Sequence, residues 1–211
     1  MQKAIYLVSG GIDSPVASYL GIRKGWMPVF VYFDNKPFAG EDTKERALRT
    51  IERVEEATGT RGKVIIVPHG EDLENAVGKC KRNLTCLICK RLMYRKAERI
   101  AVQNGCEAIV TGEILGEQAS QTMSNLILNS PIIKMPIIRP LIGLNKREVE
   151  DIGKSIGTYE ISITKAQGCG AASIKARTKA RLGELEGAEH ALPIDDMVDR
   201  AIKGAVVVKT G

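Results

Sequence analysis

The sequence has no long hydrophobic run and no sign of a secretory leader. No segment approaches the roughly 18 consecutive apolar residues that a membrane-spanning helix needs, so we expect no membrane partner. A strand-like run begins close to the N-terminus, at Ala4, and nothing before it resembles a signal peptide. By default we therefore expect a cytoplasmic protein.

Cysteine and histidine are also scarce. Five cysteines, an odd number without a secretion signal, argue against a disulfide scaffold and favour metal, cluster or catalytic sulfur chemistry. The two histidines, His69 and His190, stand alone in the sequence, and we interpret both as surface or loop residues rather than metal ligands. Neither an internal repeat nor a low-complexity segment is present.

The remaining composition is that of an ordinary globular chain. Its 211 residues, 44% hydrophobic and 27% charged, suffice for one α/β domain with a sizeable core. The net charge of +6 and the pI of about 9.1 permit nucleic-acid binding without proving it.

Strand-like runs alternate with helical patterns along the chain. The alternation predicts an α/β fold with a doubly wound, mostly parallel sheet and helices on both faces, whose ligands bind at the carboxyl ends of the strands. Asn35 and residues 111–113 fall there. The C-terminal region should contain a helix over 193–203, and 205–208 is either a last strand or a disordered end. The predicted strands are 4–8, 28–33, 63–67 and 108–110, and the predicted helices cover about 14–24, 41–58, 71–82, 88–104 and 145–156.

The first predicted strand runs into the segment VSGGIDSPV, residues 8–16. Ser14 and Pro15 predict a helix start, with the Ser14 hydroxyl as the cap and proline at the first helical position. Gly10 and Gly11 let backbone N–H groups approach a ligand, and the helix N-terminus adds partial positive charge, so this turn predicts a phosphate site. The turn is neither a Walker A loop, whose lysine is missing here, nor G-x-G-x-x-G.

The string SGGIDS resembles the pyrophosphate-binding loop of the PP-loop ATP pyrophosphatases. Three later strings extend the resemblance: TGEILGEQASQT at 111–122, PIIRPLIGLNKR at 136–147 and GTYEIS at 157–162. In this order they look like the ThiI family of tRNA 4-thiouridine synthetases, over roughly residues 3–172. The resemblance implies an adenine nucleotide alpha hydrolase-like fold, with a PP-loop domain at 1–175 and a helical extension of the same domain at 176–211.

The resemblance also implies an ATP-dependent tRNA sulfurtransferase. In that family ATP adenylates the 4-oxygen of a uridine in tRNA, pyrophosphate leaves, and sulfur then displaces AMP. ATP and Mg²⁺ are the implied cofactors, and tRNA and a sulfur donor are the implied partners. By position, the pyrophosphate contacts are Ser9, Gly10, Gly11, Asp13 (also catalytic) and Ser14; Leu7, Val8, Tyr32 and Phe33 lie near the adenosine; and Lys90, Gly112 and Gln121 complete the ATP site.

The sequence departs from the family pattern in three respects. Glu117 and Gln118 stand where the family has glutamine and an apolar residue. The PP-loop region begins at residue 3, so we expect no tRNA-gripping THUMP region before it and no rhodanese-like domain after it, an archaeal-type arrangement. A tRNA would then have to be held by the chain's own basic surface, such as residues 175–181, by a partner subunit, or by a homodimer.

The cysteines indicate where the sulfur comes from. Cys86 and Cys89 form a CxxC pair at a predicted helix start, a metal-ligand or redox spacing, and by position Cys169 matches the family's active cysteine. Cys86, Cys89 and Cys169 are therefore our catalytic candidates and the candidate ligands of a 4Fe–4S cluster with one open iron. Two alternatives stay open: a Cys169 persulfide resolved by the pair, and a zinc site or unused thiols. We expect Cys106 to be a small buried hydrophobe.

Two other functions also stay open. The same chemistry could act on a small molecule in thiamine-thiazole or thiouracil metabolism, and the family resemblance itself implies a role in thiamine synthesis. A non-catalytic ATP- or RNA-binding subunit is the other alternative, although such a subunit would need neither the intact SGGIDS string nor three cysteines.

Overall fold

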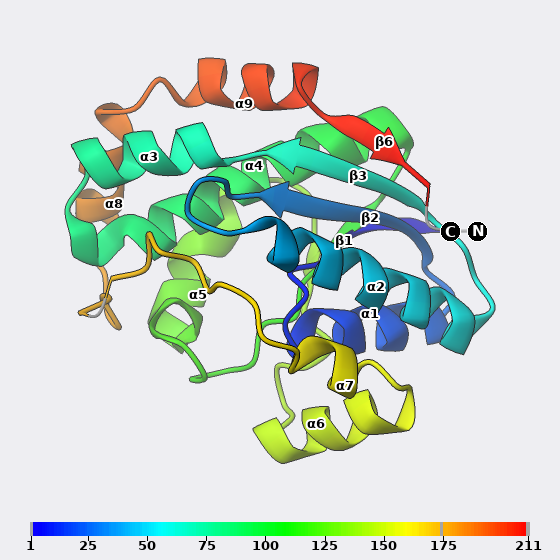
Figure 1. Cartoon of the computed structure of the whole chain (residues 1–211). Helices are drawn as coiled ribbons and strands as arrows, with labels where there is room; N and C mark the ends of the chain where they lie inside the picture. The colour runs from blue at the N-terminus through cyan, green and yellow to red at the C-terminus, as the bar shows by residue number, and fades with distance from the viewer. Residues whose placement is uncertain (1, 174, 210–211) are drawn as a thin grey trace.

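A computed structural model describes residues 2–173 and 175–209. Its centre is a six-stranded sheet of order β5-β4-β1-β2-β3-β6, in which β6 alone runs antiparallel to its neighbour (Figure 1). Apolar, β-branched runs form the inner strands, as expected for a parallel sheet covered on both faces. The strands are β1 (Lys3–Leu7), β2 (Met27–Asp34), β3 (Lys63–Pro68), β4 (Ala108–Val110), β5 (Ile137–Ile138) and β6 (Val206–Val208).

Helices connect the strands and follow the predicted pattern, with ends shifted by a few residues. The sequence did not indicate α5, α7 or β5, and α8 was expected only as part of a helical extension over 176–211. The α-helices are α1 (Asp13–Arg23), α2 (Glu41–Thr58), α3 (Gly70–Lys79), α4 (Thr85–Asn104), α5 (Met123–Asn129), α6 (Lys146–Ser155), α7 (Tyr159–Ser162), α8 (Leu182–His190) and α9 (Ile194–Lys203), and the 3₁₀ turns are η1 (Arg82–Leu84), η2 (Ala119–Gln121) and η3 (Ser130–Ile132).

Two apolar layers bury the faces of the sheet. On one face Tyr6 and Phe30 pack with residues of α1, α2 and α6, and on the other Val31 and Ile65 pack with residues of α4 and α9. Figure 1 shows α9 on one side of the strands and α1 and α2 on the other. The doubly wound arrangement with helices on both faces is therefore confirmed.

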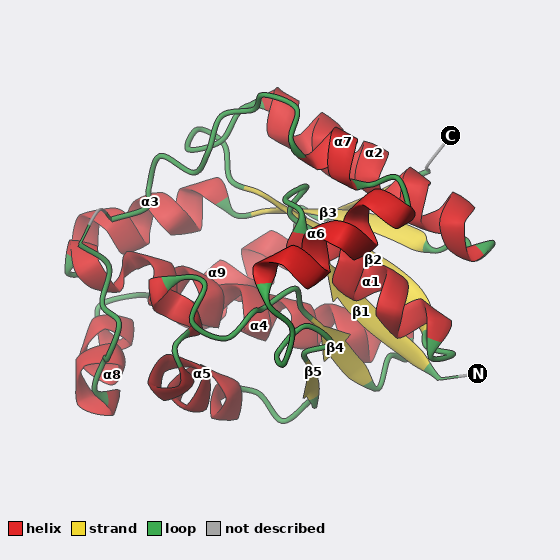
Figure 2. Cartoon of the chain, turned by 90° about the horizontal axis from the view of Figure 1, so that it is seen from below, coloured by secondary structure: helices red, strands yellow, loops and turns green. Residues whose placement is uncertain are grey.

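The C-terminal part of the chain returns to this sheet. Helices α3, α4, α8 and α9 share a third apolar cluster, and β6 pairs with β3, which resolves the choice left open for 205–208 in favour of a strand. Figure 2 shows α5 and α8 at the end of the molecule opposite the N-terminus. Among the described residues, no helix is both long enough and apolar enough to cross a membrane.

Candidate active site

The SGGIDS loop joins the carboxyl end of β1 to the start of α1. The Ser9 amide donates a hydrogen bond to the Ser14 hydroxyl (3.0 Å), so this hydroxyl holds the loop closed. The prediction that Ser14 caps α1 was wrong: the helix begins at Asp13, and no side chain caps it. Gly10 has a φ of +74°, and a Cβ there would lie 2.9 Å from the Ala47 amide nitrogen on α2. Only glycine combines this positive φ with so close an approach to the backbone of α2.

The segment after β4 presses against this loop at Gly112. A Cβ on Gly112 would lie 2.7 Å from the Ser14 amide nitrogen and 2.8 Å from the Asp13 carbonyl carbon. These are backbone atoms at the first turn of α1, which cannot move aside as a flexible side chain could. The predicted ATP residue Gly112 is therefore in contact with the predicted phosphate loop.

Next to Gly112, the buried carboxylate of Glu113 forms ion pairs with two cationic side chains. Lys90 donates to its Oε1 (2.5 Å) and Arg139 to its Oε2 (2.6 Å), while the Thr111 hydroxyl adds a bond of 3.1 Å. Burial raises the pKa of Glu113, but Lys90 and Arg139 lower it more, so the net pKa is lowered and the group is ionised. Gln121 fixes the same segment by accepting from the Ile114 amide (3.2 Å). Lys90 thus lies in an ion-pair network beside the loop.

Lys146, at the start of α6, belongs to the site although the sequence did not single it out. Its Nζ lies 3.0 Å from Asp13 Oδ1 and 3.6 Å from Glu117 Oε1. Burial lowers the pKa of Lys146, but the bond to Asp13 and the charges of Asp13 and Glu117 raise it more. Lys146 stands in the string PIIRPLIGLNKR, but nothing local distinguishes it there, and only the fold brings it to Asp13. The Glu117 departure noted in the sequence therefore bears on this lysine.

The N-terminal end of α2 packs against two loops. On one side its Thr43 carbonyl oxygen lies 3.3 Å from where a Gly10 Cβ would be, against the phosphate loop. On the other side the Thr43 hydroxyl donates to the Gln167 carbonyl (2.9 Å), and Asp42 accepts from the Gln167 amide (2.9 Å). The exposed Cys169 lies two residues beyond Gln167. One helix end thus fixes both the phosphate loop and the cysteine loop.

The CxxC pair lies on the first turns of α4. The pKa of the Cys89 thiol is raised to about 12, mainly by burial, and the charges of Cys169 and Cys86 add to the shift. His69 Nε2 lies 3.2 Å from Cys89 Sγ. His69 lies in a loop, one of the two expected placements, but the other, the surface, was wrong because its side chain is 1% exposed. Burial and the Lys96 charge lower the pKa of His69 well below its ordinary value. Cys106 is buried, as predicted.

No group of three His, Cys, Asp or Glu side chains within the described ranges could hold a single metal ion. That finding concerns one ion, so the cluster remains a prediction.

The proposed adenosine residues do not all face one way. Tyr32 packs in the layer of α1 and α2, whereas Phe33 packs in the layer of α4, with its ring centroid 5.5 Å from that of His69. Successive strand residues point to opposite faces, so these two side chains lie on different sides of the sheet, and their shared place near the adenosine stays a prediction. Leu7 ends β1, and Val8 follows it at the start of the loop.

Comparison with known proteins places this geometry in a family. The ThiI family model, described as thiamine biosynthesis protein, matches residues 1–194. A probable tRNA sulfurtransferase of Methanosarcina mazei is 39% identical over 208 residues, 98% of this chain and 51% of that protein. The chain spans about half the length of the curated relatives it matches.

Solved structures agree. The crystal structure of a 4-thiouridine synthetase–RNA complex with bound ATP matches with a TM-score of 0.92 and 32% identity, over 99% of this chain and 55% of that one. NMN synthetase from Francisella tularensis, at 16% identity and a TM-score of 0.61, over 94% of this chain and 84% of that one, shares the fold alone. With a family match over most of its length, the chain belongs to the ThiI family.

Proposed function

We propose that this chain is the ATP-using part of a tRNA sulfurtransferase that makes 4-thiouridine. The observation that carries the proposal is the end of α2: its backbone leaves no room for a side chain on Gly10 of the phosphate loop, and its Thr43 hydroxyl donates to the loop that leads to Cys169. An enzyme that activates an oxygen with ATP and then replaces it with sulfur needs these two loops in one site. The relatives named tRNA sulfurtransferase and the ATP- and RNA-bound structure support the same substrates.

The first step forms an adenylate. The uracil 4-oxygen attacks the α phosphorus of ATP, the bond to the β phosphate breaks, and pyrophosphate leaves. The amides of Gly10 and Gly11 and the N-terminus of α1 bind the departing pyrophosphate. Lys146 supplies positive charge beside Asp13 as negative charge develops on the leaving group. The carboxylates of Asp13 and Glu117 provide the oxygen ligands that Mg²⁺ prefers, and we propose that they hold it.

The second step replaces the activated oxygen. Sulfur bonds to C4 of the uracil, the C4–O bond breaks, and AMP leaves with the oxygen. We propose that Cys86, Cys89 and Cys169 hold a 4Fe–4S cluster, because Cys86 lies one helical turn before Cys89 on α4 and the charges of both Cys169 and Cys86 act on the Cys89 thiol. With three cysteine ligands such a cluster would keep one iron free of protein and would supply sulfide there. A Cys169 persulfide is the alternative.

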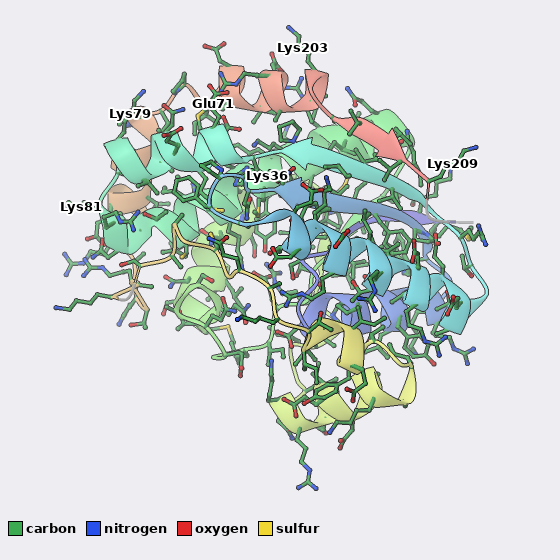
Figure 3. The ribbon with its side chains drawn as sticks, viewed as in Figure 1. Lys36, Glu71, Lys79, Lys81, Lys203 and Lys209 are labelled. Atoms are coloured by element: carbon green, nitrogen blue, oxygen red, sulfur yellow. The ribbon has the colours of Figure 1, made fainter. Side chains whose placement is uncertain are left out.

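A basic surface beside these cysteines fits the RNA. The Arg177 amide donates to the Asn83 carbonyl (2.9 Å), which joins the segment 175–181 to η1, and 175–181 is a loop rather than a helix. Figure 3 shows Lys79 and Lys81 projecting from this end of the molecule. Phosphate contacts supply most of the affinity of such surfaces. A sulfur donor completes the partners we propose, and a homodimer is one means of holding the tRNA. The exposed cations of this basic surface are Lys79, Lys81, Arg82, Lys175, Lys179 and Arg181, none of which forms an ion pair with another described residue.

The test is pyrophosphate release and 4-thiouridine formation with unmodified tRNA, ATP and sulfide. We expect Lys146→Gln to slow pyrophosphate release at least roughly tenfold, because it removes a charge at the leaving group. Lys154→Gln, an exposed lysine on the same helix, is the matched control and should leave the rate unchanged. Release that needs a small molecule and ignores tRNA would favour the alternative substrate, and no release at all would overturn the enzymatic proposal.

The sulfur site has its own test. After anaerobic purification, iron and sulfide are measured together with the absorption spectrum. The wild type is compared with Cys86→Ala, Cys89→Ala and Cys169→Ala. Loss of iron and sulfide in all three variants supports the cluster. A colourless, iron-free wild type would contradict the cluster and favour a Cys169 persulfide. Stoichiometric zinc would contradict both the cluster and the persulfide.

A further inference from the structure

Behind Cys89 runs a buried chain of polar side chains that the proposed reaction does not use. His69, which follows β3, places Nε2 at 3.2 Å from Cys89 Sγ and Nδ1 at 2.7 Å from Lys96 Nζ. Lys96 is wholly buried and forms an ion pair with Asp72 on α3. Asp72 also accepts a bond of 2.7 Å from Arg200 on α9. The loop after β3 and the helices α3, α4 and α9 therefore meet behind the sulfur atom of Cys89.

The donors and acceptors of this chain can be ordered from one end to the other. The Lys96 ammonium group has only donors, and the Asp72 carboxylate has only acceptors. Lys96 therefore donates to the lone pair of His69 Nδ1, and the ring proton of His69 must lie on Nε2. That N–H faces the sulfur of Cys89. The sulfur atom thus accepts a hydrogen bond from a ring whose tautomer is set by a buried ion pair.

Stability alone gives little reason for this arrangement. Burying an ion pair has a desolvation cost that the attraction between the two charges offsets only in part. Apolar side chains of similar size often give a protein the same stability. Here the ion pair lies directly behind a candidate sulfur ligand, and the chain ends on that sulfur.

We propose that His69 is a positioning residue for Cys89: it holds the sulfur atom through an Nε2–H···S bond, and Lys96 and Asp72 fix the ring that makes it. The contact between His69 Nε2 and Cys89 Sγ is observed in the structure, whereas its importance for sulfur transfer rests on the proposed function. The same donor serves a thiol, a persulfide or a metal-bound thiolate, because each presents sulfur lone pairs to the ring.

The first experiment needs no substitution. The reduced, metal-free chain is labelled with ¹⁵N-histidine, and the ring nitrogens are read by long-range ¹H–¹⁵N correlation. Only two histidines are present, and His190 is exposed, so the two signals are readily told apart and assigned with His190→Asn. We expect His69 to show a single Nε2–H tautomer, and Lys96→Met to abolish that preference. An Nδ1–H tautomer in the wild type would overturn the proposal.

The second experiment compares a variant without a donor with one that keeps it. His69→Leu removes the N–H, and His69→Gln retains a side-chain amide. Alkylation of Cys89 is followed by peptide mapping, with the exposed Cys169 of the same molecules as the internal control. We expect His69→Leu to slow the alkylation of Cys89 about fivefold, which is the effect of losing one ordinary hydrogen bond. His69→Gln should restore most of the alkylation rate.

The outcomes separate the two proposals. Equal Cys89 rates in the wild type and both variants would contradict the positioning role of His69. Neither experiment uses ATP or RNA, so an Nε2–H tautomer in a chain that fails to thiolate tRNA would refute the proposed function and keep this inference. Circular dichroism shows whether each variant has folded, and the wild-type tautomer decides the question if His69→Leu does not fold.

Discussion

At the scale of single residues, Gly112 leaves no room for a side chain against the phosphate loop. Gly112→Ala would place a methyl group within 2.8 Å of backbone atoms of Asp13 and Ser14. We expect this variant to lose about 1–3 kcal/mol of stability and to bind ATP at least roughly tenfold more weakly, because the phosphate loop must move to relieve the contact. Calorimetric titration with ATP and thermal unfolding measure both effects.

The control is Gly78→Ala in α3, where an added Cβ meets nothing within 4 Å. Alanine is the better helix former, so this variant should be as stable as the wild type or slightly more so. Equal ATP affinity in Gly112→Ala and Gly78→Ala would contradict the contact.

The thiol of Cys89 makes stability depend on pH in the reduced, metal-free chain. Burial, with smaller effects from Cys169 and Cys86, raises its pKa from an ordinary value near 9 to about 12. Between those values the unfolded chain has lost this proton and the folded chain still holds it. The unfolded state thus binds fewer protons, and the free energy of unfolding falls as pH rises from about 9 to 12.

Urea unfolding at several pH values checks this expectation. Cys89→Ser removes the titrating group, so its free energy of unfolding should fall less steeply above pH 9 than that of the wild type. Cys169→Ser removes only one of the smaller causes of the shift and leaves the burial of Cys89 in place, so this variant should keep most of the wild-type slope. A Cys89→Ser slope as steep as the wild type would show that other groups cause the loss.

At the scale of elements, the first turn of α2 holds the Cys169 loop. Thr43→Val keeps the shape of the side chain but removes the bond from its hydroxyl to the Gln167 carbonyl. We expect amides over 164–170 to exchange roughly fivefold faster, since one net hydrogen bond is worth about 1 kcal/mol. ATP affinity should stay the same, because this hydroxyl does not contact the phosphate loop.

Hydrogen exchange measured by mass spectrometry follows both loops at once. Thr58→Val at the far end of α2 also removes a hydroxyl bond, to the Val54 carbonyl, and serves as the matched control. If both variants leave exchange over 164–170 at the wild-type rate, the helix end does not fix that loop.

The elements that could be predicted from sequence are those with a clear local pattern. The apolar runs of β1 to β4 and the periodic face of α2 are visible in a short window, and so is the glycine turn after β1. The pair Ile137 and Ile138 is too short, and flanked by prolines, to indicate β5. Helix α8, LGELEGAEH, carries two glycines that weaken a helical pattern.

The site residues divide in the same way. Gly10, Gly11 and Gly112 stand in strings that the resemblance identified. Lys146 and His69 were missed because each acts through a residue far away in the sequence, Asp13 and Cys89 respectively. A side chain whose partner lies 133 residues away leaves no local trace. Such pairs become visible only once the topology is known.

At the scale of the whole molecule, exposed positive charge gathers at one end, where we propose that RNA binds. The basic surface of Lys79, Lys81, Arg82, Lys175, Lys179 and Arg181 lies next to η1, which leads into the CxxC helix. We expect the double variant Lys81→Gln/Lys175→Gln to weaken tRNA binding and to reduce the slope of log affinity against log salt by about 1 to 2. Fluorescence anisotropy over a range of salt concentrations measures this slope.

Lys203 and Lys209 provide a control with the same loss of charge. Figure 3 shows them away from Lys79 and Lys81, and both are exposed. Lys203→Gln/Lys209→Gln should leave the salt slope close to that of the wild type. If both double variants lower it equally, net charge rather than this surface governs binding.

The two outer strands have a consequence for assembly. The sheet is bounded by β5, with two residues between prolines, and by β6, with three residues followed by Lys209. A long flat outer strand would offer another chain a row of free amides and carbonyls, whereas short strands, prolines and lysines discourage such pairing. The sheet therefore stops at both edges. We therefore expect copies of this chain that associate to meet through helices or loops rather than by joining their sheets into one.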